Sequence, residues 1–299
     1  MVRLGLCCIF SKQPIKFKTT TVACISKMSR KDALDKIDGI CLSNANELMK
    51  ALIYCNENNI GCFRVSSNVL PIKTHPTHGY DIYDLPNGEN IVNIFKKCGE
   101  YSKLNNIRTC FHPDQFVVIN SKSDSVIERS IVEIEYHAEI AEWINADVLN
   151  IHGGGCFGDK KGSLYKFEQS LNKLSERARS RITVENDDRI YTPEDLMPIC
   201  KNSNIPLVYD VHHHRCNKDG FTIEQATELA SSTWNREPMF HISSPINGWD
   251  VKVTSPHHDY IDSNDFPDFW KNLEITVEIE AKAKELAVKK VMEFLNSTV

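Results

Sequence analysis

Short apolar runs alternate with longer amphipathic or polar segments along the whole 299-residue chain. Each run stops abruptly at polar side chains, most clearly where Leu207-Val208-Tyr209 leads into Asp210. Runs of this kind are typical of strands buried on both faces of a parallel sheet. The strands are expected at residues 2–8, 61–65, 107–111, 148–151, 181–184, 207–210, 239–242 and 275–279.

Helical patterns separate most of these strands. Apolar residues at 127, 131, 134, 138 and 141 lie on one stripe, and Thr192-Pro193 is a typical helix start. The expected helices cover residues 44–58, 91–98, 127–141, 164–179, a segment from 192, 222–232, and a last helix ending near 295. Segment 11–31 carries basic but no acidic residues; we expect a solvated loop, with a phosphate-binding arm as the alternative.

Eight strand-then-helix units in this order predict an α/β fold, a TIM (β/α)8 barrel forming one domain over residues 1–299. An open, doubly wound sheet is the alternative. An open sheet does not explain why polar residues follow nearly every strand at the same end. The closed barrel is therefore favoured.

Composition limits the partners and the cellular compartment that we expect for the protein. The net charge of −5 provides no general basic field for nucleic acid, although a local patch would suffice. No apolar run reaches the ~20 residues of a membrane helix, and the start of the chain has no secretion signal. Eleven scattered cysteines without a CxxC pair predict a reducing, intracellular compartment and no disulfides. A catalytic thiol at Cys7 or Cys8 is the alternative.

Histidines and acids gather after the predicted strands. Ten of the eleven histidines lie at strand ends or in the following loops, whereas His137 lies on a helical stripe and is interpreted as structural. In a barrel these loops share the C-terminal face. The residues in question are His75, His112, His152, Glu185, Asp210, His213, His241, His257 and Glu280.

So many acids and imidazoles converge only if cations neutralise them. Mixed histidine and carboxylate ligands suit zinc, manganese or iron, and their number favours two or three ions. Taken singly, each histidine could be an ordinary surface residue and each acid a general base. The neighbouring histidines at 78, 212, 214 and 258 are alternative ligands.

Together these motifs resemble those of the UV damage endonuclease family, metal-dependent TIM-barrel DNA-repair enzymes related in design to AP endonucleases of the endonuclease IV type. The resemblance spans nearly the whole chain in matching order. It rests on Ser66 to Pro76, His112-Pro113-x-Gln115, His152-Gly153-Gly154, Glu185-Asn186-Asp187, Asp210-x-x-His213-His214, His241 and Glu280-Ala281-Lys282.

The resemblance implies hydrolysis of damaged double-stranded DNA immediately 5′ to UV photoproducts and abasic sites. Manganese is the usual ion, with zinc or magnesium as alternatives. All nine residues named above then become metal ligands, with Glu185, Asp210 and Glu280 as the catalytic carboxylates. Gln115 and Phe116 match a pair that is pushed into the duplex opposite the lesion.

Three basic residues after strand ends, Lys160, Arg189 and Arg215, are further candidates for contacts with phosphates. Ordinary solvated charges are the alternative interpretation. We expect a monomer and no contact with membranes.

Three positions depart from the family pattern. Leu6 and Phe10 replace a tyrosine and an asparagine, which changes the expected lesion pocket. Met239 stands where some members carry a modified lysine, so we expect no such modification.

Two other functions are compatible with this fold. A sugar isomerase or epimerase would use the same barrel with fewer ligands, and a non-catalytic lesion-binding protein would not need the three carboxylates.

Overall fold

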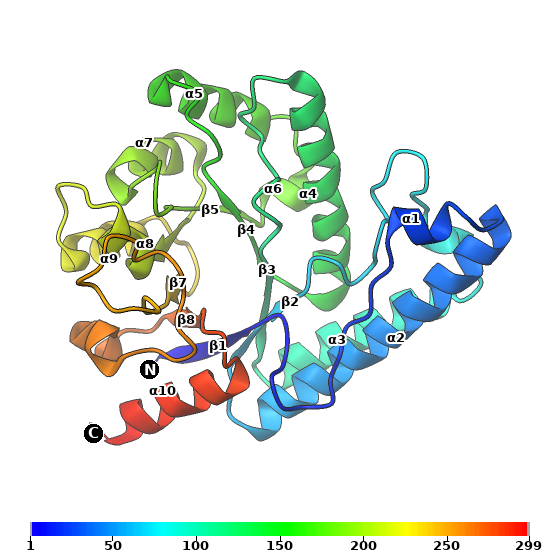
Figure 1. The fold of residues 1–299 in the computed structure, drawn as a ribbon, viewed down its shortest axis with the longest axis horizontal. Helices are drawn as coiled ribbons and strands as arrows, with labels where there is room; N and C mark the ends of the chain where they lie inside the picture. Colours follow the sequence, from blue (N-terminus) through cyan, green and yellow to red (C-terminus); the bar gives the residue numbers. More distant parts are fainter. Residues whose placement is uncertain (1, 298–299) are drawn as a thin grey trace.

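A closed barrel of eight parallel strands organises the computed structural model, which describes residues 2–297 (Figure 1). Each strand pairs with its sequence neighbours, and β8 pairs with β1, so the predicted TIM barrel is confirmed. The strands are β1 (Arg3–Cys7), β2 (Cys62–Val65), β3 (Arg108–Phe111), β4 (Val148–His152), β5 (Ile182–Glu185), β6 (Leu207–Asp210), β7 (Met239–Ile242) and β8 (Thr276–Ile279).

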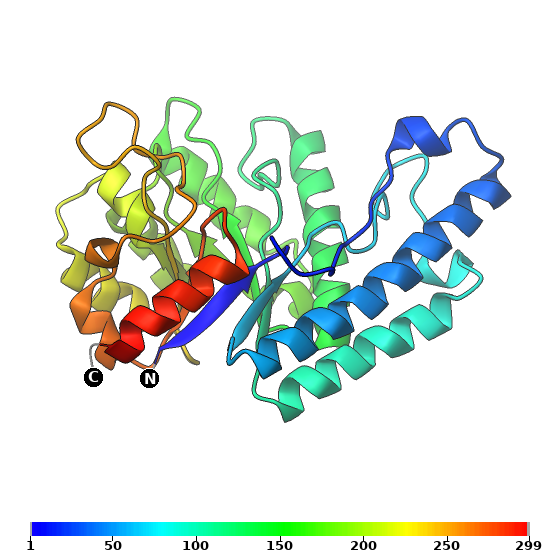
Figure 2. The same cartoon turned by 60° about the horizontal axis from the view of Figure 1, so that its bottom comes forward.

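Helices surround the barrel. They are α1 (Val22–Ile25), α2 (Arg30–Glu57), α3 (Gly88–Leu104), α4 (Asp124–Ile144), α5 (Lys160–Leu171), α6 (Glu176–Arg179), α7 (Pro193–Ser203), α8 (Val211–Cys216), α9 (Ile223–Ser232) and α10 (Glu285–Ser297). Short 3-10 helices lie at Ile82–Asp84, Ser263–Asp265 and Asp268–Asn272. The long helices α2 and α3 pack side by side and extend away from the barrel, while α10 lies along β1 (Figures 1 and 2).

Several helical segments differ from the prediction, and α8 (Val211–Cys216) follows β6 where no helix was predicted. Helix α2 begins at Arg30 rather than near 44, because Ser29 accepts a hydrogen bond from the Asp32 amide and caps the helix. The basic segment 11–31 therefore contains α1 and the start of α2. The predicted helix 164–179 is split into α5 and α6, and Ser175 caps the second piece.

The strands are buried on both faces, as their apolar composition predicts. Every residue of β5, β6, β7 and β8 is buried, including Glu185, Asp210, His241 and Glu278. All eleven cysteines lie within the described residues, and each is free. No helix among residues 2–297 is both long and apolar enough to cross a bilayer.

Parallel strands place their C-terminal ends on one side of the barrel. The long β7–β8 connection, orange in Figure 2, rises above that side. The candidate site lies there, since the residues that follow β3, β4, β5, β6, β7 and β8 line one cavity of about 630 Å³.

Candidate metal centre

Glu185, the last residue of β5, lies at the middle of a cluster of imidazoles. Its side chain is fully buried. Its Oε2 lies 2.9 Å from Nε2 of His112, and its Oε1 lies 3.1 Å from Nδ1 of His241 and 3.3 Å from Nδ1 of His213. Asn150 on β4 donates a 2.5 Å hydrogen bond to Oε2 and fixes the carboxylate from the other side.

Asp210 ends β6 and also caps α8. Its Oδ1 accepts a 2.8 Å hydrogen bond from the His213 amide. Its Oδ2 is buried and has no hydrogen-bond partner among the described residues, although it lies 3.4 Å from Nδ1 of His213. The cap thus places His213 close to the strand end and leaves one carboxylate oxygen free to bind a ligand.

A backbone carbonyl contacts one ring nitrogen in each of two histidines of the cluster. Nδ1 of His112 lies 3.1 Å from the Pro113 carbonyl, and Nδ1 of His213 lies 3.0 Å from the Asn186 carbonyl. A carbonyl only accepts, so Nδ1 donates its hydrogen in each contact, and the neutral His112 ring keeps its lone pair on Nε2, which faces Glu185. Nδ1 of His213 lies close to Glu185 and Asp210 as well as to the carbonyl. The carbonyl fixes the tautomer, as it does for histidines that bind metals.

Three further predicted ligands join the cluster. The His152 ring lies 4.9 Å from that of His112, and its buried Nδ1 has no partner among the described residues. Glu280 Oε1 lies 3.4 Å from Nδ1 of His241, and Glu280 Oε2 lies 3.8 Å from Nδ1 of His257.

A buried ion pair beneath the cluster was not predicted. Arg64 on β2 donates through Nε and Nη2 to Glu278 Oε2, at 2.9 and 2.5 Å. The same Nη2 lies 2.7 Å from Glu280 Oε1 and 3.1 Å from Nε2 of His241. Gly5 leaves room for this pair, because a Cβ there would lie 3.2 Å from Cγ of Glu278.

Neighbouring charges strongly shift the pKa values of Glu185, His241 and Glu278. Burial raises the pKa of Glu185, but His241, His152 and His112 outweigh it and hold that pKa well below its usual range. Burial lowers the pKa of His241, yet Glu185 raises it to about 10. Burial raises the pKa of Glu278, but Arg64 and His241 lower it to about 2. The carboxylates therefore stay charged and attract positive charge into the site.

The cluster fits divalent metal ions. Among the described residues, four groups have ligand atoms within 4.8 Å of one another. Three of them belong to the cluster: His112, His152 and Glu185; His112, His241 and Glu280; and Glu185, Asp210 and His213. The fourth, Cys62, Cys110 and Glu278, lies inside the barrel and shares Glu278 with Arg64. The unpartnered atoms of Asp210 and His152 are the kind that a bound ion satisfies. Nitrogen and oxygen donors in this mixture suit zinc or manganese.

His75 is placed differently from the other predicted ligands. Its Nδ1 accepts hydrogen bonds from the amides of Thr77 and His78, and its ring contacts that of His78 at 5.3 Å. These contacts all lie within its own loop. His137, interpreted as structural, is fully buried on α4 and bonds the Glu133 carbonyl.

The predicted DNA contacts fall into two groups. Gln115 and Phe116 are exposed, the latter by 78%, and Gln115 lines the cavity. Arg189 also lines it, with a side chain that is 79% exposed. Lys160 forms a 2.6 Å ion pair with Asp195. Arg215 lies over Trp249 and 3.6 Å from Asp265.

The glycine run after His152 is required by the packing of the protein itself. A Cβ at Gly153 would lie 2.6 Å from the Tyr191 ring, and Gly154 has φ +78° and abuts Asn120. Asn120 donates to the carbonyls of Gly153 and Gly155 and binds the β4–α5 loop to the β3–α4 loop.

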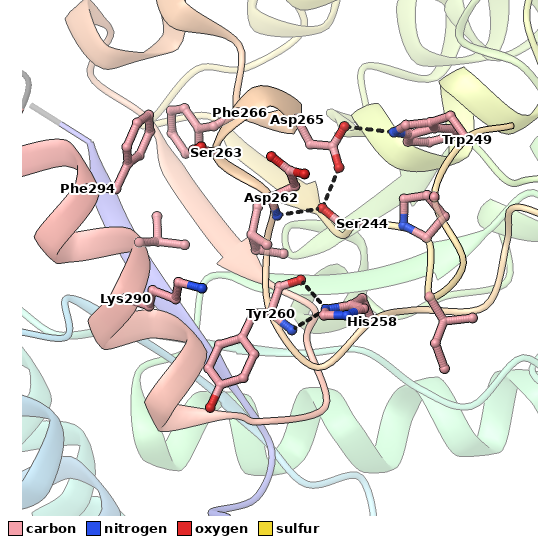
Figure 3. Close-up of a pocket in the computed structure, with 15 residues that line it drawn as sticks. Ser244, Trp249, His258, Tyr260, Asp262, Ser263, Asp265, Phe266, Lys290 and Phe294 are labelled. Carbon is pink, nitrogen blue, oxygen red and sulfur yellow. Dashed lines mark hydrogen bonds between the residues drawn. The ribbon is translucent and has the colours of Figure 1, made fainter.

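A set of hydrogen bonds, partly shielded from solvent, holds the β7–β8 loop that carries His257 (Figure 3). Asp265 accepts from Ser244 Oγ at 2.5 Å and from Trp249 Nε1 at 2.8 Å. Ser244 Oγ in turn accepts from the Asp262 amide, and the Tyr260 amide donates to Nδ1 of His258. His258 therefore serves the loop, whereas His257 points toward Glu280.

Sequence reasoning missed Arg64, Glu278 and Asn150. The strongest available signal was at Glu278: it is a charged residue inside an apolar strand, two positions before Glu280, and so faces the same side of β8. Arg64 gives the same signal in β2.

Known proteins resemble this chain in fold and in sequence. A family model described as UV-endonuclease UvdE matches residues 2–298. A UV DNA damage endonuclease of Bacillus cereus (strain G9842) is 30% identical over 291 residues, covering 94% of this chain and 89% of that protein. The crystal structure of SacUVDE matches with a TM-score of 0.88 and 27% identity, covering 100% of this chain and 99% of that one. Endonuclease IV from Thermus thermophilus shares the fold, with a TM-score of 0.61 and 13% identity over 84% of this chain and 93% of its own. The predicted resemblance is thus confirmed, and the chain belongs to the UV-endonuclease UvdE family.

Proposed function

We propose that the protein cuts damaged double-stranded DNA immediately 5′ to UV photoproducts and abasic sites, using two or three divalent ions. As a member of its family, the chain is a metal-dependent DNA-repair endonuclease. The observation that carries the proposal is Glu185, a buried carboxylate within 3.3 Å of nitrogens from three histidines. A sugar isomerase on the same barrel is disfavoured by this family membership.

We assign the metal ligands to the predicted set, with Glu185 shared between neighbouring ions. The three compact groups described above support seven of the nine, and the approach of His257 to Glu280 supports an eighth. His75 stays a proposed ligand, although its contacts lie within its own loop. When bound, such ions polarise the phosphate and lower the pKa of water.

The protein's own residues position the charges. Asn150 and the carbonyls of Pro113 and Asn186 orient Glu185, His112 and His213 before substrate arrives. Preorganised groups of this kind need no rearrangement when charge develops on the phosphate. The fixed geometry supports a hydrolytic rather than a purely binding role.

DNA is proposed to enter across the open cavity. Gln115 and Phe116 stand at its edge and would fill the space that a displaced lesion leaves in the duplex. Moving a base out of the duplex costs the least free energy where its pairing is already damaged. Arg189 would contact a phosphate by leaving Asp188, whose Oδ2 lies 3.4 Å from its Nε, an exposed pair that is worth little. Lys160 and Arg215 would first have to leave Asp195 and Asp265.

The test uses a labelled duplex with one pyrimidine dimer or one abasic site. Manganese-loaded protein should release a fragment whose 3′-hydroxyl lies directly 5′ to the lesion, and EDTA should abolish the cut. Cutting at any other bond would refute the proposed position. Tight binding without a cut, in protein shown to hold metal, would favour the non-catalytic alternative.

Two smaller proposals concern the state and setting of the protein. We propose a monomer, which sedimentation of the metal-loaded protein tests. We also propose a reducing intracellular compartment, which agrees with eleven free cysteines.

A further inference from the structure

Phe157, in the loop after β4, is an aromatic residue held in an unusual backbone conformation. Its φ is +48°, a left-handed value that costs free energy for a bulky side chain, and Gly158 follows with φ +86°. The side chain nevertheless remains 41% exposed to solvent. Neither catalytic carboxylates nor metal ligands explain why the loop should present a phenylalanine in this way.

The left-handed turn folds the ring back over the edge of the cavity. A Cβ on Gly155 would lie 2.6 Å from Cζ of Phe157, so the tip of the ring packs directly against Gly155. Gly155 itself lines the cavity that contains His112, His152 and Glu185. Phe157 therefore stands at the rim of the candidate metal centre, with part of its ring open to solvent.

The loop beneath the ring is rigid. Asn120 binds both the amide and the carbonyl of Gly155, and the Tyr191 hydroxyl donates to the same carbonyl at 3.1 Å. Because Asn120 belongs to the loop that also carries Phe116, the two exposed aromatic side chains are borne on connected loops. A firmly held exposed ring loses little entropy when it packs against a ligand.

The ammonium group of Lys122 lies close to the Phe157 ring. Nζ of Lys122 lies 5.9 Å from the ring centroid of Phe157, above its face. Lys122 is exposed and forms no ion pair among the described residues. An aromatic ring with an ammonium group over one face is a combination that binds an unpaired nucleotide, with the base on the opposite face of the ring and the phosphate on the lysine.

We propose that Phe157 and Lys122 form a second DNA-positioning contact, which stacks one base next to the lesion and holds its phosphate. The inference rests on the proposed function, because it assumes that damaged DNA enters this cavity. Phe157 acts as a positioning residue: it keeps the strand in register with the metal centre and takes no part in bond cleavage.

The test compares Phe157→Ala with Phe157→Trp and with Tyr165→Ala. Tyr165, an aromatic residue of α5 that is 64% exposed, is the matched control. Binding of metal-loaded protein is measured by fluorescence anisotropy on a lesion-containing duplex in which an uncleavable linkage replaces the phosphate to be cut, so that no cutting occurs. Phe157→Ala should weaken binding by about 5- to 150-fold, the equivalent of the ~1–3 kcal/mol lost per stacked base. Phe157→Trp should restore it, and Tyr165→Ala should leave it unchanged.

A base analogue distinguishes stacking from a general loss of structure. The fluorescence of 2-aminopurine placed beside the lesion should be quenched by wild-type protein and by Phe157→Trp, but not by Phe157→Ala. The unfolding temperatures of all variants should agree.

Two outcomes separate this inference from the proposed function. If Phe157→Ala binds and quenches like wild type while wild type still cuts the duplex, the second contact is refuted and the endonuclease remains. If wild-type protein neither binds nor cuts damaged DNA, both fall together.

Discussion

At His112, a neighbouring acceptor decides which of the two ring nitrogens faces the cluster. The carbonyls of Pro113 and Asn186 engage Nδ1 of His112 and of His213. The remaining lone pair of His112 then lies 2.9 Å from a Glu185 oxygen, a contact that a cation between the two atoms stabilises. The orientation of single side chains thus indicates a metal centre from the protein alone.

Glu185→Gln should abolish cutting while sparing DNA binding. The variant keeps the shape of the side chain but removes the charge that several imidazoles face. We expect a loss of nicking of at least ~100-fold, more than the loss of a group that only orients a ligand. Nicking of UV-irradiated plasmid measures activity, and anisotropy measures binding. Glu285→Gln, another fully buried glutamate, is the control. Wild-type activity in Glu185→Gln would contradict the shared-ligand role.

His137 should make the fold sensitive to acid. Burial lowers its pKa from 6.5 to about 4, so the folded state resists a proton that the unfolded chain accepts. Its contribution to stability is therefore complete above pH 6.5 and is lost as the pH falls toward 4. Relative to His137→Gln, wild type should lose roughly 3 kcal/mol of unfolding free energy over this interval. Urea denaturation at several pH values measures the difference. Parallel curves for both proteins would rule the effect out.

The connections after the strands differ in what holds them and in what they expose. Hydrogen bonds from Asn120 and Tyr191 hold the loop after β4, and Asp265 holds the loop after β7. The loop after β3 instead exposes Gln115 and Phe116. We infer that the held loops keep the ligands in place, while the exposed tip is available to DNA.

Removing that tip should reduce the recognition of damage. Gln115→Ala combined with Phe116→Ala deletes the groups that would fill the gap in the duplex. The preference for lesion-containing over intact duplex should fall about tenfold or more, because one lost stacking contact is worth ~1–3 kcal/mol. Competition binding measures the ratio. An unchanged preference would exclude these two residues from lesion recognition.

Asp265→Ala should loosen the β7–β8 loop. It leaves the Ser244 hydroxyl and the Trp249 indole without their acceptor, which costs about 1–3 kcal/mol for buried donors. Limited proteolysis should cut the loop faster than in wild type. Asp268→Ala, whose side chain is 91% exposed, is the control. Equal rates of cleavage for both variants would show that Asp265 does not hold the loop.

The strands and their C-terminal ends could be predicted because buried parallel strands leave a plain apolar pattern. The start of α2 was missed, although Ala33, Ile37 and Cys41 continue the helical stripe at a spacing of four residues. Small, weakly hydrophobic residues such as Ala33 and Cys41 make this stripe less apparent than the one at Leu48 and Leu52. Arg64 and Glu278 each stand out as a charge inside an apolar strand, but neither residue alone identifies its partner. Only the barrel, which brings β2 beside β1 and β1 beside β8, shows that they pair.

In the molecule as a whole, the fold brings acidic side chains together at the C-terminal face of the barrel, and their mutual repulsion lowers its stability. Glu185, Asp210 and Glu280 converge there, and Arg64 supplies one compensating charge from beneath. Such a gathering of acids is favourable only when cations complete it. Metal binding and the stability of the fold should therefore be coupled.

A manganese titration of metal-free protein, followed by both thermal unfolding and nicking of UV-irradiated plasmid, tests the central claim most directly. Metal at about a hundred times its Kd should stabilise the fold by ~2.7 kcal/mol and raise the unfolding temperature by on the order of 5 °C. Nicking should appear over the same range of metal concentration, and EDTA should reverse both changes. Nicking that is equally strong in EDTA, or an unfolding temperature that manganese does not move, would contradict a metal centre at this face of the barrel.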